Sequence, residues 1–471
     1  MLEELLFKKI ELWLVGLTVL LFTVFLAGWS FAVTKYHVFP YSTLVRLNQF
    51  VEGHQQDKRS IFKRLQSELA FDPLEFSAPR KTVLIPDENL LAVESVENKS
   101  SGLGIIATDM KFFSNTEKTR YFIVFGSFVF PEQEINIGAI LIDSNGTLHR
   151  SWAIRPDTYE YLGPQIGLEV TSAGDVLTNT NGVLISYDWC GEKNWEAPWS
   201  PPANGIRRNP DAVDGYGWHH DIVAIDEKIY TFVGSSLMTV DSRNGQILSD
   251  VHAVDLMTWA RNSGLYIFDA RSKKPFSDDD YNRTNLVDLF HKDPFHFNKA
   301  DVLTIEDADQ YDIFEAGDIL LSLRELNLLV VARPATESII WYRYGLTRAQ
   351  HDATFNSGYI DVFDNNNSSI PPKPKIVRLS IERNEVKTLF DLSTWGMVMR
   401  AKGNFELDGN QLLVTDDDAG RMIFGTLDGE VNFVFENSYR PSGSEPTNLQ
   451  LRNATEIAPE QVQRFESQCA Q

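Results

Sequence analysis

Histidine, arginine and asparagine side chains gather between residues 219 and 351, in short motifs that flank apolar runs. The residues concerned are His219, His220, His296, Asn298, Arg324 and His351. A neutral imidazole is a competent nucleophile at neutral pH and is also released again readily. Arginine adds permanently charged, planar donors that suit the oxygens of an anion. Together these residue types are suited to chemistry on an anionic group.

Each of these residues also has a simpler interpretation when it is taken alone. A single histidine at the start of a strand is more often a hydrogen-bonded structural residue than a catalyst. Asn298 could be a turn residue and Arg324 a packed surface residue. We interpret Asp364 and Asn365 as a turn, and the acidic run 416–418 as a solvated turn rather than a cation site. The argument for chemistry therefore depends on the set as a whole.

The order of the motifs is the stronger signal. The motifs are H-H-D at His219–Asp221, H-F-N at His296–Asn298, S-L-R at Ser322–Arg324, Q-H-D-A at Gln350–Ala353 and F-D-N at Phe363–Asn365. In these motifs the sequence resembles the arylsulfotransferase family, the β-propeller enzymes that move a sulfuryl group from one phenol to another. The resemblance covers roughly residues 135–436.

The resemblance implies a role for each motif. His351 matches the family's nucleophile, which forms a transient sulfo-histidine. His296, Asn298 and Arg324 match the residues that hold the sulfuryl oxygens. A sulfuryl group needs such fixed donors because negative charge spreads over its three non-bridging oxygens during transfer. No cofactor, metal ion or nucleotide donor is implied, and the chain has no glycine-rich phosphate loop.

One histidine of the H-H-D motif matches an upstream histidine that faces the substrate oxygen and passes protons. His219 and His220 would face opposite sides of a strand, so only one of them can line the channel. We assign His220 to this role, with Asp221 as a residue that orients it.

The elements that must position these residues are short apolar strands, which begin at about residue 103 and alternate with Gly, Asp and Asn turns. A D-x-x-G turn recurs, for instance at Asp143–Gly146 and Asp188–Gly191. Six sheet-like units result, at 103–154, 165–199, 219–250, 295–343, 350–392 and 402–436. Repeated units too small to bury their own faces predict an all-β β-propeller. The repeats alone do not separate six blades from seven, and the resemblance implies a six-bladed β-propeller.

The whole chain divides into four predicted regions. These are an N-terminal transmembrane anchor at 1–34, a juxtamembrane helical stalk and linker at 35–102, the propeller at 103–440 and a loose C-terminal tail at 441–471. The insertion at 252–294 is partly helical, from Leu286 to His291, and we expect it near the pocket. The stalk is either a spacer or a pair of helices that joins two copies of the chain.

The anchor prediction depends on residues 12–34, which contain no charged side chain. As a helix they would span roughly 34 Å, enough to cross a bilayer core. Lys8 and Lys9 precede the segment and place the N-terminus in the cytoplasm. The propeller would then lie in the periplasm or outside the cell on an uncleaved, single-pass anchor. The alternative is a cleaved signal peptide, for which Ser30 and Ala32 could mark the site.

Charge and cysteine content limit the partners and the compartment. The net charge is −22, which argues against nucleic acid and anionic lipid surfaces as partners. The expected partners are therefore small aryl sulfates and phenols, together with the membrane that the N-terminal helix would cross. Cys190 and Cys469 are the only cysteines, and they either pair in an oxidising compartment or stay as two free thiols.

Three functions are compared. The preferred one is an exported, membrane-anchored arylsulfotransferase-like enzyme, a nucleotide-independent transferase from an aryl sulfate to a phenolic acceptor. A metal-dependent hydrolase would use the histidines as ligands, although the chain has no H-E-x-x-H motif. A non-catalytic propeller in the cell envelope would bind a ligand or act as a scaffold, because the D-x-x-G repeat supports the fold and not the activity.

Overall fold

The computed structural model describes residues 84–95, 109–130, 135–155, 164–180, 183–198, 217–234, 236–263, 268–269, 274–275, 295–366, 371–383, 385–399, 402–417, 419–440 and 447–469. The predicted anchor at 1–34 and the helical part of the predicted stalk lie outside these residues. Within the described ranges, no helix combines the length and the apolar character needed to cross a membrane.

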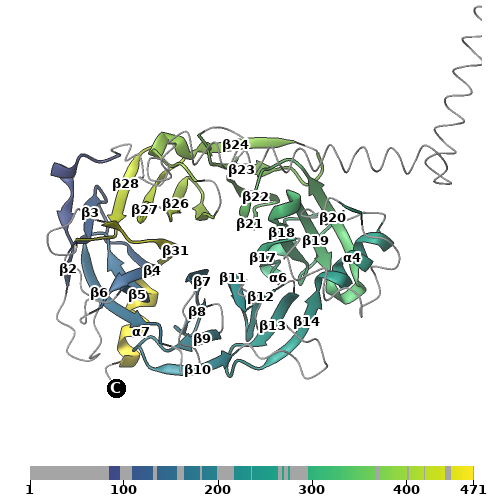
Figure 1. Cartoon of the computed structure of the whole chain (residues 1–471), viewed down its shortest axis with the longest axis horizontal. Coiled ribbons are helices and arrows are strands. Elements are labelled where there is room, and N and C mark those ends of the chain that lie inside the picture. The colour runs from purple at the N-terminus through teal and green to yellow at the C-terminus, as the bar shows by residue number, and fades with distance from the viewer. Residues whose placement is uncertain are drawn as a thin grey trace, which may run out of the picture. The chain divides into compact units, whose positions relative to one another are not determined.

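Six antiparallel sheets of the described residues surround a common centre, each with one strand innermost, so the prediction of an all-β, six-bladed propeller is confirmed (Figure 1). Blade 1 consists of β31 (Leu451–Ile457), β4 (Tyr121–Val129), β5 (Ile135–Asp143) and β6 (Thr147–Ala153), and blade 2 of β7 (Pro164–Val170), β8 (Val176–Thr180), β9 (Val183–Tyr187) and β10 (Lys193–Pro198). Blade 3 consists of β11 (Trp218–Ile225), β12 (Lys228–Val233), β13 (Ser236–Asp241) and β14 (Ile247–His252).

The second half of the ring repeats this arrangement. Blade 4 consists of β17 (Phe297–Val302), β18 (Ile319–Leu323), β19 (Leu328–Arg333) and β20 (Ser338–Tyr344), and blade 5 of β21 (His351–Asn356), β22 (Tyr359–Asp364), β23 (Lys375–Leu379) and β24 (Val386–Asp391). Blade 6 consists of β25 (Asn404–Asp408), β26 (Gln411–Asp416), β27 (Arg421–Thr426) and β28 (Val431–Glu436), followed outward by β3 (Lys111–Ser114) and β1 (Leu91–Ala92).

Short elements complete the described residues. Strand β2 (Glu94–Ser95) pairs in parallel with β6, and two small ribbons pair β15 (Phe268–Asp269) with β16 (Lys274–Pro275) and β29 (Ser438–Tyr439) with β30 (Thr447–Asn448). The helices are α4 (Ala253–Asn262), α6 (Ile305–Ala308) and α7 (Pro459–Cys469), with single turns η1 (Asp87–Asn89), η3 (Arg324–Leu326), η4 (Pro334–Thr336) and η5 (Leu392–Trp395).

The D-x-x-G segments form the predicted turns between strands. In the turn from β5 to β6, Asp143 Oδ1 accepts hydrogen bonds from the backbone N–H groups of Asn145 and Thr147, both at 2.9 Å. Gly146 follows with φ +80°, and a Cβ at that position would overlap the ring of Phe112. The aspartate and the glycine therefore fit this turn for the two reasons that the sequence suggested.

Apolar side chains fill the spaces between neighbouring blades. Six buried clusters occur among the described residues, and each joins two adjacent blades. Between blades 3 and 4, for example, the ring of Phe232 stacks on that of Phe297 with centroids 5.7 Å apart. Each blade thus buries its faces against its neighbours, which makes the closed ring the unit that holds the central strands in place.

The C-terminal residues close this ring. β31 pairs with β4 as the innermost strand of blade 1, so the first blade combines chain segments from opposite ends of the described sequence. The prediction of a loose tail at 441–471 is wrong for these residues. Local periodicity could not reveal the error, because the partner of β31 lies about 330 residues earlier in the chain.

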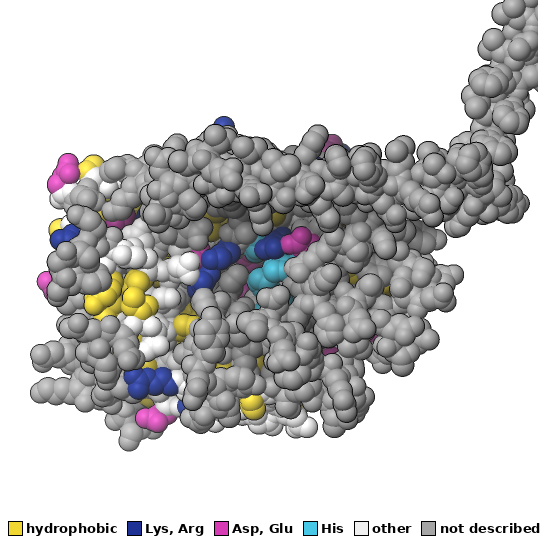
Figure 2. Space-filling view, in the orientation of Figure 1, with side chains coloured by type: hydrophobic (Ala, Val, Ile, Leu, Met, Phe, Trp, Pro, Cys, Tyr) yellow, Lys and Arg dark blue, Asp and Glu magenta, His cyan; other side chains and the backbone are white. Residues whose placement is uncertain are grey.

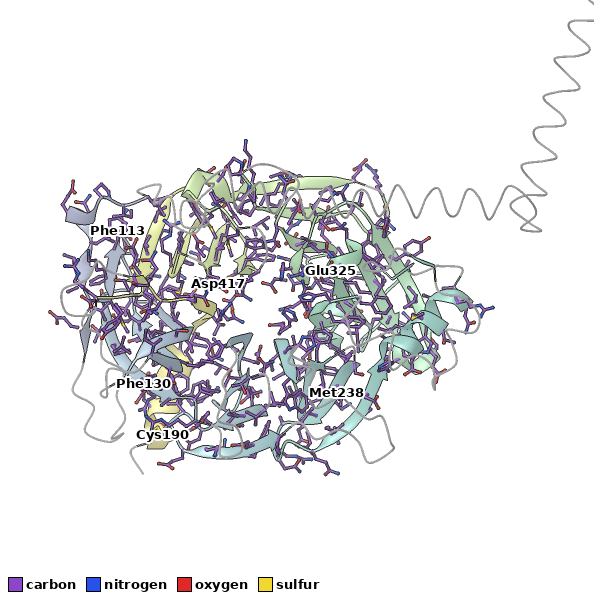
Figure 3. The ribbon with its side chains drawn as sticks, viewed as in Figure 1. Phe113, Phe130, Cys190, Met238, Glu325 and Asp417 are labelled. Carbon is purple, nitrogen blue, oxygen red and sulfur yellow. A yellow bond between two sulfur atoms is a disulfide. The ribbon has the colours of Figure 1, made fainter. Side chains whose placement is uncertain are left out.

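Helix α7 packs under blades 1 and 2 and is bonded covalently to the ring. Phe465 is fully buried against Trp189, and Glu466 accepts hydrogen bonds from Arg150 and from Trp189 Nε1. A disulfide joins Cys190 to Cys469, which resolves the two alternatives for the cysteines in favour of pairing; Cys190 lies beside α7 (Figure 3). The disulfide holds the end of α7 against blade 2, and α7 directly follows β31, the strand that closes the propeller.

Replacing both cysteines with alanine should lower the free energy of unfolding by on the order of 3–5 kcal/mol, because the disulfide closes a loop between residues 279 positions apart. Denaturant unfolding of the oxidised full chain and of the variant measures the difference. Reductant should lower the stability of the wild type and leave the variant unchanged. Equal stability of the two proteins would show that the disulfide does not support closure.

Helix α4 of the insertion at 252–294 lies away from the centre of the propeller. α4 packs against β20 at the outer edge of blade 4, with Leu256 and Met257 buried (Figure 1). The expectation of an extension near the pocket is therefore wrong for α4. The predicted helix from Leu286 to His291 lies outside the described residues.

Candidate active site

Backbone bulges in the innermost strands shape the centre of the propeller. The strand pairing shifts by extra residues between His219 and Ile222 in β11, between Phe297 and Lys299 in β17, and between His351 and Thr354 in β21. Near these bulges, φ is positive at His220, His296 and Asp352. A bulge breaks the alternation of a strand. Asp221, Lys299 and Asp352, which lie at these bulges, contact one another across blades 3, 4 and 5.

His220 and His296 face each other across two blades. Their Nε2 atoms lie 3.0 Å apart and the ring centroids 4.7 Å, in an edge-to-face arrangement. Both side chains are partly exposed. Figure 2 shows histidine side chains reaching this face in the middle of the propeller, next to basic and acidic side chains. The pair can therefore meet a ligand that enters the channel.

His219 packs edge-to-face against His220, with the ring centroids 4.9 Å apart. Its Nε2 lies 2.7 Å from the carbonyl oxygen of Gly234, and the ring is 7% exposed beside Phe232. His220 is thus the residue of H-H-D that meets His296, in line with our assignment. The reason differs from simple alternation, because the positive φ of +60° at His220 turns its side chain at the bulge.

His351 lies in the same site and is held at both ring nitrogens. Nδ1 lies 2.6 Å from Asn365 Oδ1 and 3.0 Å from the carbonyl oxygen of Ala349. Nε2 accepts a hydrogen bond of 3.2 Å from the backbone N–H of Lys402. The side chain is only 2% exposed, so a reacting atom can reach Nε2 only if the Lys402 peptide moves aside.

Burial and neighbouring charge lower the pKa values of His351 and His220. Burial, assisted by Arg324 and His296, lowers the pKa of His351 to about 3, although Asn365 and Ala349 act in the opposite direction. Burial, followed by the charges of His296 and His219, holds the pKa of His220 well below its usual range. Because His351 and Arg324 also act on His220, the four predicted residues His220, His296, Arg324 and His351 occupy one electrostatic environment.

Arg324 begins the turn η3 at the end of β18. Its backbone N–H donates to the carbonyl oxygen of His296 at 3.1 Å, which fixes it beside that histidine. Its Nη2 donates to Glu325 Oε1 at 2.6 Å. Glu325 and Asp417 lie on opposite sides of the centre (Figure 3). The guanidinium retains further N–H groups that can bind an anion.

Asn298 is buried next to His351. Its Nδ2 donates to the carbonyl oxygen of Gln350 at 2.8 Å, and its Oδ1 has no hydrogen-bond partner among the described residues. Gln350 itself is fully buried, and its amide binds backbone carbonyls of Leu323 and Leu328. The first residue of Q-H-D therefore supports the strand, whereas Asn298 keeps one amide hydrogen available for a ligand.

Beneath the histidines, an ion-pair triad joins three blades. Lys299 Nζ lies 2.6 Å from Asp221 Oδ2 and 2.9 Å from Asp352 Oδ1. Burial lowers the pKa of Lys299, but Asp221 and Asp352 outweigh it and raise the pKa well above its usual value. Asp352 Oδ2 also accepts a hydrogen bond of 2.6 Å from the backbone of Phe405 in blade 6. Asp221 therefore binds Lys299 and does not orient His220 as we expected.

Further carboxyl groups surround the triad. Burial raises the pKa values of Glu169 and Asp301, and it raises that of Glu406 to about 7 against hydrogen bonds from Thr455 and Glu456. These groups come from β7, β17 and β25. Buried carboxyl groups thus outnumber the one buried lysine around the triad, which favours protonated carboxyl groups there.

Two residues of the acidic run 416–418, which we interpreted as a solvated turn, are buried, and Asp418 lies outside the described residues. Asp416 and Asp417 are 3% and 1% exposed. Asp416 pairs with Arg421 at 2.6 Å, while Asp417 pairs with Arg452 at 2.7 Å and with Lys402 at 3.4 Å. The interpretation was wrong because Arg452, on β31, reaches Asp417 only when the ring closes. Asp417 instead pairs with the side chain of Lys402, and the backbone N–H of Lys402 bonds His351 Nε2.

Two residues of the site, Asn365 and Lys402, were not predicted from the sequence. Asn365 was assigned to a turn, yet it is fully buried and contacts His351. Lys402 carried no motif. The F-D-N motif was the available signal for Asn365, whereas no local pattern indicated Lys402. Among the described residues, no three His, Cys, Asp or Glu side chains gather in an arrangement that could hold a metal ion.

Fold and site together define a class of protein, a six-bladed β-propeller that carries several histidines and an arginine at its centre. The chain belongs to the arylsulfotransferase (ASST) family, whose sequence model matches residues 169–438, more than half of the chain. The match contains every predicted site residue. No significant match was found among curated protein sequences.

Solved structures resemble the chain only distantly. A protein of unknown function from Bacteroides caccae shares 11% identity at a TM-score of 0.44, covering 72% of this chain and 99% of its own. Virginiamycin B lyase from Staphylococcus aureus shares 11% identity at a TM-score of 0.38, covering 71% and 89%. A streptogramin B lyase shares 13% at 0.39, covering 74% and 97%. At these values they do not bear on the function.

Proposed function

We propose that this protein transfers a sulfuryl group from an aryl sulfate donor to a phenolic acceptor through a transient sulfo-histidine at His351. The observation that carries the proposal is the meeting of His220, His296, Arg324 and His351 in one site, with both His220 and His351 neutral. A neutral imidazole retains the lone pair that must attack sulfur, and a nearby cation attracts the sulfate ester.

In the first half of the reaction, the Nε2 lone pair of His351 forms a bond to sulfur while the bond from sulfur to the donor phenol oxygen breaks. The electron pair of that bond leaves with the phenolate, which a ring N–H of the His220–His296 pair stabilises by a hydrogen bond. The product is the sulfo-histidine, with its Nδ1 proton still bonded to Asn365. The departed phenolate takes its proton from water.

In the second half, the acceptor phenol gives its proton to the neutral His220, and its oxygen attacks sulfur. The bond from sulfur to Nε2 breaks and its electron pair returns to His351. The proton on His220 then passes to solvent, so the sum is exchange of a sulfuryl group for a phenol proton. This scheme requires a neutral His220, in keeping with the lowered pKa.

Charge on the sulfuryl oxygens is held by fixed donors. Arg324 supplies guanidinium N–H groups and Asn298 its remaining amide hydrogen. The third donor is the backbone N–H of Lys402, which lies 3.2 Å from Nε2 and therefore close to the position of a sulfuryl oxygen on that nitrogen. As sulfur approaches, this N–H moves from Nε2 to the oxygen, so its hydrogen bond is exchanged and not lost.

We also propose a cellular location for the protein. The uncharged segment at 12–34 anchors the chain in a membrane, with the propeller on the periplasmic or outer side. The disulfide between Cys190 and Cys469 supports an oxidising compartment. The substrates are then small aryl sulfates and phenols that reach this side of the membrane.

The test uses the full-length protein with an aryl sulfate that releases a coloured phenol, with and without an acceptor phenol. We expect release that continues only with acceptor, and without acceptor a single turnover that leaves one sulfuryl group on His351, detected by peptide mass spectrometry. Continuous release without acceptor would indicate a sulfatase. No release across a panel of donors, from a folded protein, would favour the non-catalytic propeller.

A further inference from the structure

Asn365 occupies a position from which its side chain binds two partners of the site. It follows β22 directly, and its side chain is fully buried. Oδ1 lies 2.6 Å from His351 Nδ1, and Nδ2 donates to the carbonyl oxygen of Lys402 at 2.6 Å. One amide therefore connects the imidazole to the peptide segment that lies over its other ring nitrogen.

The orientation of the Asn365 amide follows from its partners. A carbonyl oxygen can only accept hydrogen bonds, so the NH2 group of Asn365 must face Lys402 O. The reversed orientation would place two oxygens 2.6 Å apart, without a hydrogen between them. Oδ1 consequently faces His351, and it is an acceptor.

The same reasoning determines the tautomer of His351. Nδ1 meets two acceptors, Asn365 Oδ1 and the carbonyl oxygen of Ala349, so Nδ1 carries the hydrogen. Nε2 meets a donor, the backbone N–H of Lys402, so Nε2 carries the lone pair. Three hydrogen bonds from three separate chain segments agree on one tautomer, which is the form able to bond to sulfur at Nε2.

The surrounding backbone holds both acceptors in place. Asp364 Oδ1 accepts hydrogen bonds from the backbone N–H groups of Arg348 and Asn366, which fixes the end of β22 against the residues before β21. Ala349 has φ +50°, and its N–H binds Asn327 Oδ1 at 2.8 Å. These contacts aim the carbonyl oxygen of Ala349 and the amide of Asn365 at the same nitrogen.

We infer that Asn365 is a positioning residue that fixes His351 as the Nδ1–H tautomer and ties it to the Lys402 peptide, so that Nε2 is the one nitrogen presented to sulfur. The inference rests on the proposed function for its chemical consequence, but the tautomer itself can be tested without any activity. A histidine whose orienting partner is lost populates the wrong tautomer and loses rate.

Two substitutions separate the contacts of Asn365. Asn365→Leu has a similar volume and removes both hydrogen bonds. Asn365→Asp retains an acceptor for Nδ1–H but opposes the carbonyl oxygen of Lys402. A matched control is Asn410→Leu, since Asn410 bonds Asp428 on the exposed side of blade 6 and does not contact the site.

The experiment is 15N nuclear magnetic resonance of the full-length protein labelled at histidine, with the His351 signals assigned by their absence in His351→Gln. We expect the wild type and Asn410→Leu to show a protonated Nδ1 and an unprotonated Nε2. Asn365→Asp should keep this pattern, and Asn365→Leu should show a mixture of the two tautomers. A wild-type signal for protonated Nε2, or an unchanged tautomer in a folded Asn365→Leu, would overturn the inference.

Kinetics then measure the consequence for transfer. We expect Asn365→Leu to lower kcat by about 10²–10³-fold with a smaller change in KM, because the substrate contacts remain. Asn365→Asp should fall between this variant and the wild type. If the wild type transfers no sulfuryl group, the proposed function fails while the tautomer result still stands or falls by itself. A full rate for a folded Asn365→Leu would contradict the positioning role.

Discussion

Replacement of His351 by glutamine should lower the rate of sulfuryl transfer by roughly four orders of magnitude, the scale seen when a covalent nucleophile is removed from a catalytic unit. Glutamine can still donate to Asn365 Oδ1 and accept from the Lys402 peptide, but it has no lone pair able to form a stable bond to sulfur. The loss should therefore appear in kcat, and the covalent sulfo-enzyme should be absent from peptide mass spectra.

A matched control is His149→Gln. His149 lies on β6 in blade 1, where its Nε2 pairs with Asp143 at 2.9 Å, and it has no contact with the site. We expect this variant to retain wild-type transfer. Circular dichroism and unfolding curves verify that His351→Gln is folded. Substantial turnover by a folded His351→Gln would assign the nucleophile to another residue, for which His220 and His296 are the next candidates.

Replacement of Lys299 by methionine should lower the free energy of unfolding by about 3–5 kcal/mol, because it leaves buried carboxylates without their cation. The methionine has a similar shape, so the effect is electrostatic and not a loss of packing. Asp221 and Asp352 contact Lys299 from blades 3 and 5, and their side chains are only 7% and 6% exposed. The variant also loosens the strands that carry His220 and His351, so transfer should fall with stability.

The loss should grow as the pH rises. Burial already raises the pKa of Asp221 to about 6 in the presence of Lys299, and removal of the cation raises it further. A carboxyl group whose pKa is higher in the folded state binds protons more tightly there than in the unfolded chain. Its contribution to stability is full below about pH 4, the unfolded pKa, and is lost as the pH rises through the folded pKa. Denaturant unfolding at pH 4 to 8 measures this slope.

Two further variants test whether the loss of stability in Lys299→Met is electrostatic. A neutral triad, Lys299→Met with Asp221→Asn and Asp352→Asn, should recover much of the lost stability because no charge remains buried. Lys387→Met, on the exposed outer strand β24, should change stability by less than about 0.5 kcal/mol. A pH-independent loss in Lys299→Met, or no recovery in the neutral triad, would show that the triad does not act through its charges.

Much of the fold could be predicted from the sequence because the four main strands of each of blades 2 to 6 come from one continuous stretch of chain. The strands within a blade follow one another along the chain, and their turns use the Asp and Gly side chains at fixed positions. Blades 2 to 6 therefore appear close to the predicted units. The first blade differs, because β31 and β4 are far apart in sequence and β3 joins the outer edge of blade 6.

The candidate site was likewise predictable only in part. The residue types of His220, His296, Arg324 and His351 and the order of their motifs predicted the family. Individual partners were not predictable. The contacts between His351 and Lys402 and between Lys299 and Asp221 join different blades, and they depend on how the closed ring brings those blades together.

The sequence by itself thus determined the class of fold, the family and the chemical groups available for transfer, because these follow from residue types and from periodicity within short segments. Only the tertiary structure decided that His220 and not His219 meets His296, that Asn365 orients His351, and that Cys190 and Cys469 pair. The physical reason is that bulges, ring closure and burial set the direction and the protonation of a side chain, and all three depend on contacts between distant parts of the chain.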